Sequence, residues 1–552
     1  MRTTCDTRPR NGPNRPNGPI LPKPPQLPPL PNNYFLQTIC FLAQKELLLR
    51  LQTSNCETQY FIRPDYSITI MVFSDLFFLF VFLPAFAICY ILASLLERKI
   101  KSEDGGRSCV LRNGVAVLFS FIFYGWGEPV YVFLMLFCVV INYLSGLAID
   151  RYEGTRRRSA LLLGLVCNIL ILGVFKYAGF IATTLNAIGI PMPVPQIALP
   201  IGISFYTFQS ISYLVDVYRH ESPAQHKFGS LLLYISMFPQ LVAGPIVRYD
   251  TIAREINSRS TTAQDISEGV FRFMIGLGKK VIIANQFSEL ADQFLLNGVD
   301  SLSTAGAWIG TVAYALQIYF DFSGYSDMAI GMGRCMGFHF NENFNHPYIA
   351  TSITEFWRRW HISLGSFFRD YVYIPLGGNR RHQSLNILVV WFLTGMWHGA
   401  SWNFVLWGLY FGVIVLIEKY TILRFSERIP RLVQHIYALM LVLCSWGLFY
   451  YDSFDSMGLF YRALFGGSSV AADIAEHTAL MGNFWLWVVA ILFTMPLRSL
   501  LTDRLATLCG THTTALAWTQ LTLRVVLSLA ILILSVALLV GATNNAFIYT
   551  RF

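Results

Sequence analysis

Two histidines stand in strongly aromatic sequence. His361 ends the run Phe356-Trp-Arg-Arg-Trp-His361, and His398 is followed closely by Trp402 and Asn403. His398 falls within hydrophobic sequence long enough to cross a bilayer, where an ionisable side chain marks a functional site by default. An imidazole titrates near neutral pH and therefore suits general acid or base catalysis. The sequence thus predicts these two histidines as the catalytic residues.

His398 is predicted to sit at a tight break between two helices. Only the tripeptide Gly-Ala-Ser separates it from the next apolar run, which begins at Trp402. No aqueous loop fits into so short a connection. Trp397 and Trp402 flank the break, and Asn403 is near enough in sequence to fix the orientation of the imidazole. A belt of interfacial aromatic residues would explain the tryptophans but not the histidine.

His361 is predicted to lie on the apolar side of an amphipathic helix. Ser352 and Glu355 have the spacing of a capping box, which starts a helix. Apolar residues then recur at helical spacing as far as Tyr371, and most charged residues fall on the other side. Such a helix is too charged to span and is typical of a membrane interface. The alternative is a buried histidine that bonds only to a backbone carbonyl.

Four arginines around this segment are candidates for binding an anionic donor. Arg358 and Arg359 lie within the predicted helix, and Arg380 and Arg381 end the flexible turn that starts at Pro375. Basic turns of this kind bind phosphate groups or anionic lipid. Anchoring to membrane lipid is the equally good alternative.

Two carboxylates close another apolar run at or near membrane depth. They are Asp321 and Asp327, after the run Trp308 to Phe320. Buried acids need partners, and Arg334 or a histidine would serve. They are either proton-relay groups of a transporter or supports that hold helices around a reaction centre, and we favour support.

Composition indicates an all-α, polytopic membrane protein. Of 552 residues, 54% are hydrophobic and only 13% are charged, which is more apolar surface than a soluble fold of this size hides. The apolar runs are continuous rather than alternating, so the spans are helices. The net charge of +9 comes largely from short loops, which indicates positive-inside topology rather than nucleic-acid binding. The ten cysteines show no metal-type spacing, and no metal site is expected.

At about 20 residues per span, the chain holds about 11 to 12 transmembrane or re-entrant helices. Residues 1–70 begin with a Pro-rich stretch that is expected to be disordered, and Met71 is a candidate true start. The basic loops 98–112 and 151–158 are expected in the cytoplasm. The spans are predicted near 75–96, 113–126, 129–149, 159–182, 198–216, 228–245, 304–330, 384–398, 402–420, 433–451, 483–497 and 522–541, with 268–285 as a further re-entrant candidate.

Residues 71–552 resemble the membrane-bound O-acyltransferase (MBOAT) family, in particular its bacterial branch that O-acetylates exported polysaccharides such as alginate. The resemblance rests on several long motifs in the family's order. They are the start at Met71, Leu199-Pro-Ile-Gly-Ile-Ser-Phe-Tyr-Thr-Phe-Gln209, Phe238-Pro-Gln-Leu-Val-Ala-Gly-Pro-Ile246, Gln317-Ile-Tyr-Phe-Asp321-Phe-Ser-Gly-Tyr-Ser-Asp327, and the region from Phe356 to Gly412.

The resemblance implies a fold, a site and partners. The fold would be a ring of tilted helices around a central tunnel, with interfacial amphipathic helices. His398 would be the essential histidine and His361 the second active-site position, with His361 or Asn403 stabilising an oxyanion. Tryptophans Trp360, Trp397 and Trp402 would exclude water.

No bound cofactor is implied, and acetyl-CoA or another acetyl thioester would be the donor substrate. The implied partners are a periplasmic esterase-like acetyltransferase, polysaccharide export machinery and membrane lipid, at the bacterial inner membrane. Within the family, D-alanyl or peptidoglycan acyl transfer is the alternative. Outside it, the alternative is a proton-coupled secondary transporter.

The C-terminus generates a first prediction. The ending Phe547-Ile-Tyr549-Thr-Arg-Phe552 is similar to the branch's aromatic C-terminal motif, although Thr550 stands where another aromatic residue is expected. The resemblance implies that Tyr549 relays the acyl group. Tyr549→Phe removes the hydroxyl that would carry it and should abolish acetylation, measured as the acetyl content of the polysaccharide. Full retained activity would remove Tyr549 from the mechanism.

Overall fold

The computed structural model describes residues 71–97, 109–296, 298–497 and 513–542, and these residues form helices and no strands. The predicted all-α class is therefore confirmed. Helices satisfy their backbone hydrogen bonds internally, as a hydrocarbon environment requires. The extension 1–70 lies outside the described residues, and its separate status stays a prediction.

The helices follow one another with short connections. From the N-terminal side they are η2 (Phe78–Phe82), α2 (Leu83–Glu97), α3 (Val110–Gly127), α4 (Tyr131–Arg151), α5 (Gly154–Leu172), η3 (Gly173–Tyr177), α6 (Ala178–Ala187), α7 (Ile203–Arg219), α8 (Phe228–Ser236), α9 (Phe238–Leu241), α10 (Tyr249–Asn257), α11 (Ala263–Gly278), η4 (Lys279–Ala284), α12 (Asn285–Ala291), η5 (Asp292–Leu296) and η6 (Val299–Ser301). They continue with α13 (Thr304–Met336), η7 (Pro347–Ile349), α14 (Ile353–Arg359), α15 (Ile362–Phe368), η8 (Arg369–Tyr373), α16 (Gln383–His398), α17 (Trp402–Tyr420), η9 (Ile422–Arg424), η10 (Ser426–Arg428), α18 (Arg431–Tyr450), α19 (Phe454–Leu464), α20 (Ile474–Met481), α21 (Phe484–Thr494) and α23 (Thr513–Leu539).

Seven helical segments among the described residues are long and apolar enough to cross a membrane, or up to eight if α20 and α21, bent by 57°, form one broken span. The chain is therefore a multi-pass membrane protein. The seven segments are Phe78–Glu97, Val110–Gly127, Tyr131–Arg151, Gly154–Ala187, Trp402–Arg424, Arg431–Tyr450 and Trp518–Leu539.

The other predicted spans form helices that differ from simple membrane crossings. The segment 228–245 divides into α8 and α9, because Met237 leaves helical geometry and Pro239 begins a new helix. Helix α16 has 16 residues, fewer than a bilayer needs. Most residues of α13 are buried within the described part of the chain. These helices build the interior, which explains why fewer than the predicted number qualify as spans.

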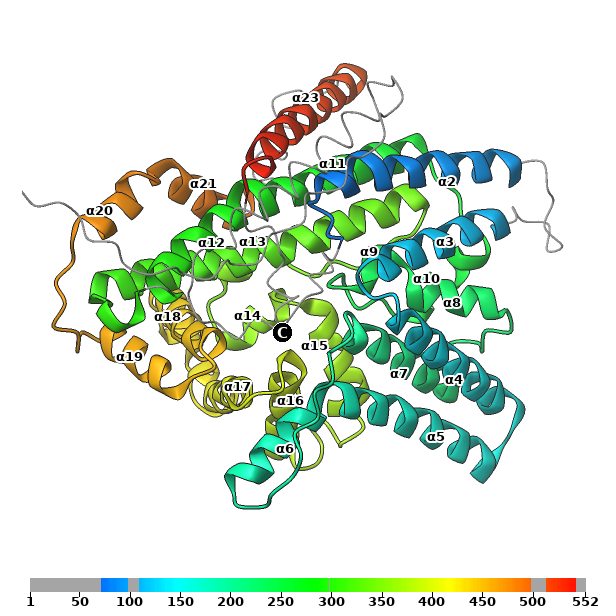
Figure 1. Ribbon diagram of the computed structural model, residues 1–552, viewed down its shortest axis with the longest axis horizontal. Helices are drawn as coiled ribbons and strands as arrows, with labels where there is room; N and C mark the ends of the chain where they lie inside the picture. Colours follow the sequence, from blue (N-terminus) through cyan, green and yellow to red (C-terminus); the bar gives the residue numbers. More distant parts are fainter. Residues whose placement is uncertain (1–70, 98–108, 297, 498–512, 543–552) are drawn as a thin grey trace, which may run out of the picture. The chain divides into compact units, whose positions relative to one another are not determined.

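Helix α13 is locked against α11 at backbone contact distance, and Figure 1 shows the two running beside each other. A Cβ atom on Gly276 would lie 2.5 Å from the carbonyl oxygen of Gly324, and one on Gly324 would lie 2.8 Å from the oxygen of Gly276. Only glycine allows helices to approach so closely. The contact brings the acidic residues of α13 beside the lysines of η4.

Helix α14 is fixed to α17 by a buried carboxylate. Glu418 of α17 is fully buried and accepts hydrogen bonds from the backbone N–H groups of Ile353 (2.6 Å) and Thr354 (2.8 Å). A negative charge at a helix N-terminus satisfies unpaired donors and favours the helix dipole. In Figure 1, α14 and α15 lie between α13 and the pair α16–α17. The ring around a central tunnel stays a prediction.

Candidate functional site

The predicted break at His398 is present. Helix α16 ends at His398, and α17 begins after the Gly-Ala-Ser connection. Gly399 is extended, but a Cβ atom there would collide with the ring of Phe404, so space rather than conformation demands glycine. Farther from the break, a Cβ atom on Gly408 would lie 3.0 Å from the Cα of Gly395. The two helices therefore pack backbone to backbone and hold the break rigidly.

The imidazole of His398 is enclosed by aromatic rings. His398 is 5% exposed. Its ring centroid lies 4.9 Å from that of Trp397, 4.9 Å from that of Trp407 and 5.2 Å from that of Phe449, all in edge-to-face geometry. Such an environment excludes water, and this is the condition that acyl transfer requires to avoid hydrolysis of a thioester.

His361 sits at a second break, which corrects one expectation. The predicted continuous amphipathic helix is wrong, because α14 ends at Arg359 and α15 begins at Ile362. His361 has φ of +45°, a left-handed conformation that a non-glycine residue holds only when its surroundings impose it. The predicted partition is correct, with the apolar side chains buried and Arg358 exposed.

The start of this segment also differs in detail from the predicted capping box. Ser352 accepts the backbone N–H of Glu355, as expected, at 3.0 Å. The Glu355 carboxylate accepts instead from the N–H of Thr351, at 2.9 Å. The reciprocal bond is therefore displaced by one residue, while the helix begins where predicted.

A fixed amide orients His361. The Nδ1 atom of His361, which is 2% exposed, lies 3.1 Å from Oδ1 of Asn343. The Nδ2 group of Asn343 donates to Ser326 at 3.1 Å, so Oδ1 is an acceptor and His361 Nδ1 carries the proton. The hydroxyl of Ser363 donates to the same oxygen at 2.9 Å. In the neutral ring, Nε2 is then the unprotonated nitrogen.

Trp397 connects the two histidines. Its ring centroid lies 5.6 Å from that of His361 and 4.9 Å from that of His398. The far side of the indole packs against Phe205 and Phe208 of α7. Two breaks in separate helices thus present their imidazoles to one tryptophan.

Not all of the predicted surrounding residues gather here. Trp360 is buried among other rings, including Phe344 and Trp446, rather than against His398. Trp402 is 47% exposed and contacts Phe180, so it does not wall the site. Asn403 is fully buried, and its amide donates to the carbonyl of Leu448 at 3.2 Å.

Both predicted acids have basic partners, although not the predicted ones. Lys280 pairs with Asp321 at 2.6 Å, with both side chains almost completely buried. Asp327 accepts from Lys279 at 2.6 Å and from Arg272 at 2.8 Å. The expectation that Arg334 would serve is wrong, because Arg334 reaches Glu268 of α11 instead, at 2.7 Å. The cations adjacent on η4 are closer because α11 and α13 touch.

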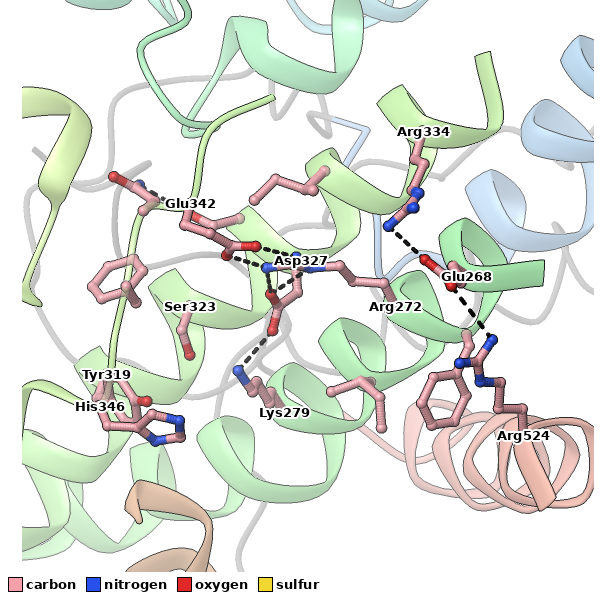
Figure 2. A pocket seen from close by; sticks show the side chains of 16 residues that line it. Glu268, Arg272, Lys279, Tyr319, Ser323, Asp327, Arg334, Glu342, His346 and Arg524 are labelled. Atoms are coloured by element: carbon pink, nitrogen blue, oxygen red, sulfur yellow. Dashed lines mark hydrogen bonds and ion pairs between the residues drawn. The ribbon is translucent and has the colours of Figure 1, made fainter. Parts of the chain in front are cut away.

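A charged cavity of about 310 Å³ adjoins the His361 end of the site, and Figure 2 shows Asp327 at its centre with Arg272 and Lys279 pointing toward it. Asn343, which orients His361, is one of its lining residues. Neither histidine lines it. The lining residues are Glu268, Phe271, Arg272, Ile275, Lys279, Tyr319, Ser323, Ser326, Asp327, Ile330, Arg334, Glu342, Asn343, Phe344, His346 and Arg524.

The four arginines predicted to bind the donor lie elsewhere. Arg359 pairs with Glu355 at 2.9 Å one turn away, and Arg358 is exposed. Arg380 and Arg381 are exposed in the turn before α16. Their role stays a prediction, and so does that of Tyr549, which lies outside the described residues.

The sequence analysis missed Trp407 and Asn343. A signal for Trp407 was present, because it stands four residues after Asn403 and so shares its helix face. The indole N–H of Trp407 has no hydrogen-bond partner within the described ranges, although the residue is 1% exposed. Asn343 carries no local signal, since it belongs to an irregular segment that only the fold brings to His361.

These features define a class of protein. A multi-pass helical membrane protein carries two histidines at helix breaks, enclosed by aromatic rings and adjoining a charged cavity. The arrangement suits transfer of an activated group in a dry site.

Comparison with known proteins agrees with this class. Residues 121–460 match the model of MBOAT, the membrane-bound O-acyltransferase family. The chain belongs to this family and is an O-acyltransferase. The transporter alternative is thereby set aside.

Three characterised relatives show the range within the family. The chain is 42% identical to the probable alginate O-acetylase of Azotobacter vinelandii, over 74% of this chain and 82% of that protein. It is 42% identical to the probable alginate O-acetylase of Pseudomonas aeruginosa, over 72% and 75%. It is 34% identical to the peptidoglycan O-acetyltransferase of Helicobacter pylori, over 64% and 74%.

The buried pair of Lys280 and Asp321 generates a stability prediction. Asp321→Ala leaves an uncompensated buried cation and should lower the free energy of unfolding by about 3–5 kcal/mol. The double variant Asp321→Ala with Lys280→Met should recover most of that loss. Thermal unfolding in detergent, followed by circular dichroism, measures both. The matched control, Arg359→Ala, breaks a more exposed pair and should cost less than about 1 kcal/mol. Equal stability of Asp321→Ala and the wild type would show that the pair is not a support.

Proposed function

We propose that the chain transfers an acetyl group from a cytoplasmic thioester, acetyl-CoA, across the bacterial inner membrane for O-acetylation of an exported polysaccharide. The observation that carries the proposal is the imidazole of His398 at a tight helix break, ringed by Trp397, Trp407 and Phe449. A titratable base in dry surroundings is what the transfer of an acyl group to a hydroxyl requires.

In the proposed reaction, His398 acts as general base. It takes the proton from the acceptor hydroxyl as the oxygen attacks the thioester carbonyl. A carbon–oxygen bond forms, the carbon–sulfur bond breaks, and the departing sulfur receives the proton from the imidazolium. The acceptor leaves as an acetyl ester and the donor leaves as a free thiol, so atoms and charge balance.

The tetrahedral intermediate carries an oxyanion that needs hydrogen-bond donors. Removing a single such donor commonly costs about 10²- to 10³-fold in rate. We assign this role to the Trp407 indole N–H, which is buried and unpartnered among the described residues. His361 or Asn403 remains the alternative. The Nδ1–H tautomer of His361 favours acceptance at Nε2, and protonated His361 would donate there.

We propose that the charged cavity binds the anionic part of the donor. Among its lining residues, cations exceed carboxylates by one, with Arg272, Lys279, Arg334 and Arg524 against Glu268, Asp327 and Glu342. Guanidinium groups bind phosphates through paired hydrogen bonds. The cavity adjoins Asn343, so a donor held there has its acyl end directed toward the histidines.

Positive-inside topology favours a cytoplasmic opening of this cavity. The end of α13 lies beside the end of α2, because Arg259 donates to the carbonyl of Met336 at 3.0 Å and also to Tyr90. The loop that follows α2, residues 98–112, is basic and is expected in the cytoplasm. The cavity is lined by residues of the last turns of α13 and so lies toward that side.

Relatives support the choice of acceptor. Those named as alginate O-acetylases are 42% identical to this chain, whereas the teichoic acid D-alanyltransferase of Bacillus subtilis is 28% identical over 39% of it. We therefore infer that a polysaccharide is acetylated, with peptidoglycan as the second candidate. A periplasmic esterase-like partner and the export machinery would complete the transfer.

The role of His398 has a direct test. Membrane vesicles from the producing host, with the cytoplasmic face outward, should release free thiol from added radiolabelled acetyl-CoA and incorporate label into polymer. His398→Ala removes the base and should reduce thiol release at least about 100-fold. His339→Ala, which changes an exposed histidine paired with Glu255, is the matched control and should retain full activity. Unchanged thiol release in His398→Ala would reject the mechanism.

The donor site is tested separately in the same vesicles. Arg272→Gln removes a charge-assisted contact to phosphate and should raise the KM for acetyl-CoA about tenfold or more, with kcat changed much less. Arg380→Gln and Arg381→Gln change arginines of the exposed turn and should leave the KM unaltered. The opposite pattern would move the donor site from the cavity to the turn.

A further inference from the structure

The helix that ends at His398 is held from outside by a neighbouring span. Three residues of Gly154–Ala187 contact the α16–α17 connection. Tyr177 donates from its hydroxyl to the carbonyl of Met396 at 2.8 Å, and Lys176 donates from Nζ to the carbonyl of Trp397. Phe180 packs edge-to-face on Trp402, with ring centroids 5.5 Å apart. The contacts fall on both sides of His398.

These bonds satisfy the free end of a helix. The last four carbonyl groups of an α-helix have no partner within it. In α16 the carbonyl of Gly395 accepts the N–H of Gly399, and those of Met396 and Trp397 accept from the neighbouring span. A cation near these carbonyls also favours the negative end of the helix dipole. The span therefore fixes the last turn of α16.

Lys176 is placed unusually for a lysine. It belongs to an apolar segment long enough to span the membrane, where a charged side chain is costly and marks function. Other buried cations of the described residues, such as Lys280, pair with carboxylates. Lys176 instead contacts a backbone carbonyl, lies 3.4 Å from the hydroxyl of Ser204, and stands over the ring of Trp397 at 5.9 Å.

The backbone of the span is altered at this point. Residues Gly173–Tyr177 form a π-helical turn, η3, between α5 and α6. Such turns are rare and concentrate at functional sites, because they change the direction of the side chains that follow. Here the turn ends with the two residues that reach α16.

We propose that Lys176 and Tyr177 are positioning residues that hold the last turn of α16, and with it the imidazole of His398, in the geometry needed for acyl transfer. The proposal rests on the proposed function of His398. Lys176 acts twice, through the Trp397 carbonyl and against the Trp397 ring, which itself contacts both histidines. Loss of either residue frees the helix end without removing a group that touches substrate.

The experiment compares four variants with the wild type. Tyr177→Phe and Lys176→Met each remove one bond to α16, and Lys176→Arg retains a cationic donor. Tyr143→Phe is the matched control, because it removes a tyrosine bond of 2.7 Å to the carbonyl of His226, far from α16 in sequence and at the end of α4.

Two readouts are taken on the full-length protein in vesicles. The first is the rate at which diethyl pyrocarbonate modifies His398, followed by mass spectrometry of its peptide. The second is kcat and KM for thiol release from acetyl-CoA. A displacement of about 1 Å at a catalytic group costs up to about 100-fold in rate. We expect Tyr177→Phe and Lys176→Met to change the modification rate at least about threefold and to lower kcat about 10- to 100-fold with KM nearly constant.

Lys176→Arg should recover most of kcat, and Tyr143→Phe should match the wild type in both readouts. Unchanged kcat in both Tyr177→Phe and Lys176→Met would overturn the proposal, whatever the modification rate. Where Lys176→Met fails to fold, shown by size-exclusion chromatography in detergent, Tyr177→Phe decides alone. A wild-type protein that releases no thiol defeats the proposed function, whereas the modification rates still report whether these residues hold His398.

Discussion

The close packing of α16 on α17 is the constraint on which the site depends. Where Gly395 faces Gly408, the backbones touch, and a side chain at either position would force them apart. The connection after His398 is then too short to move independently, and the ring of Phe404 fills the space beside Gly399. The imidazole inherits its position from two rigid helices rather than from a loop. A group placed in this way loses little freedom when it acts, which is the basis of catalytic preorganisation.

Charge is used in the interior as a structural device as well as a chemical one. Lys280 with Asp321, and Lys279 with Asp327, join the helices α11–η4 and α13 where glycines bring them together. Glu418 joins α17 to α14 by binding two backbone N–H groups. Each buried charge has a partner because solvation by water is absent at these positions. The same need for partners leaves one wet region, the charged cavity, next to the dry aromatic enclosure. An acyl donor has one charged part and one small apolar part, and the division between the two regions matches it.

Several parts of the site were predictable, for reasons that are local. The break at His398 follows from a connection too short for a loop, and the enclosure follows from the aromatic residues on either side. The start of α14 follows from Ser352. The predicted helix through His361 failed because apolar periodicity continues across a break that keeps the same face buried. The backbone there is held by Asn343, through its side chain and its carbonyl, from a segment that follows α13. Periodicity carries no information about such a contact.

The sequence by itself determined that the chain is helical, that it crosses a membrane repeatedly, and that His361 and His398 are its exceptional residues, because hydropathy, charge distribution and helix spacing are properties of neighbours along the chain. Only the tertiary structure decided which groups surround those histidines. Trp407 and Phe449 enclose His398 in place of Trp402, Lys280 rather than Arg334 pairs with Asp321, and Lys176 with Tyr177 holds the end of α16. These pairings join helices that are distant in sequence, and they are set by the few angles and distances at which whole helices can pack.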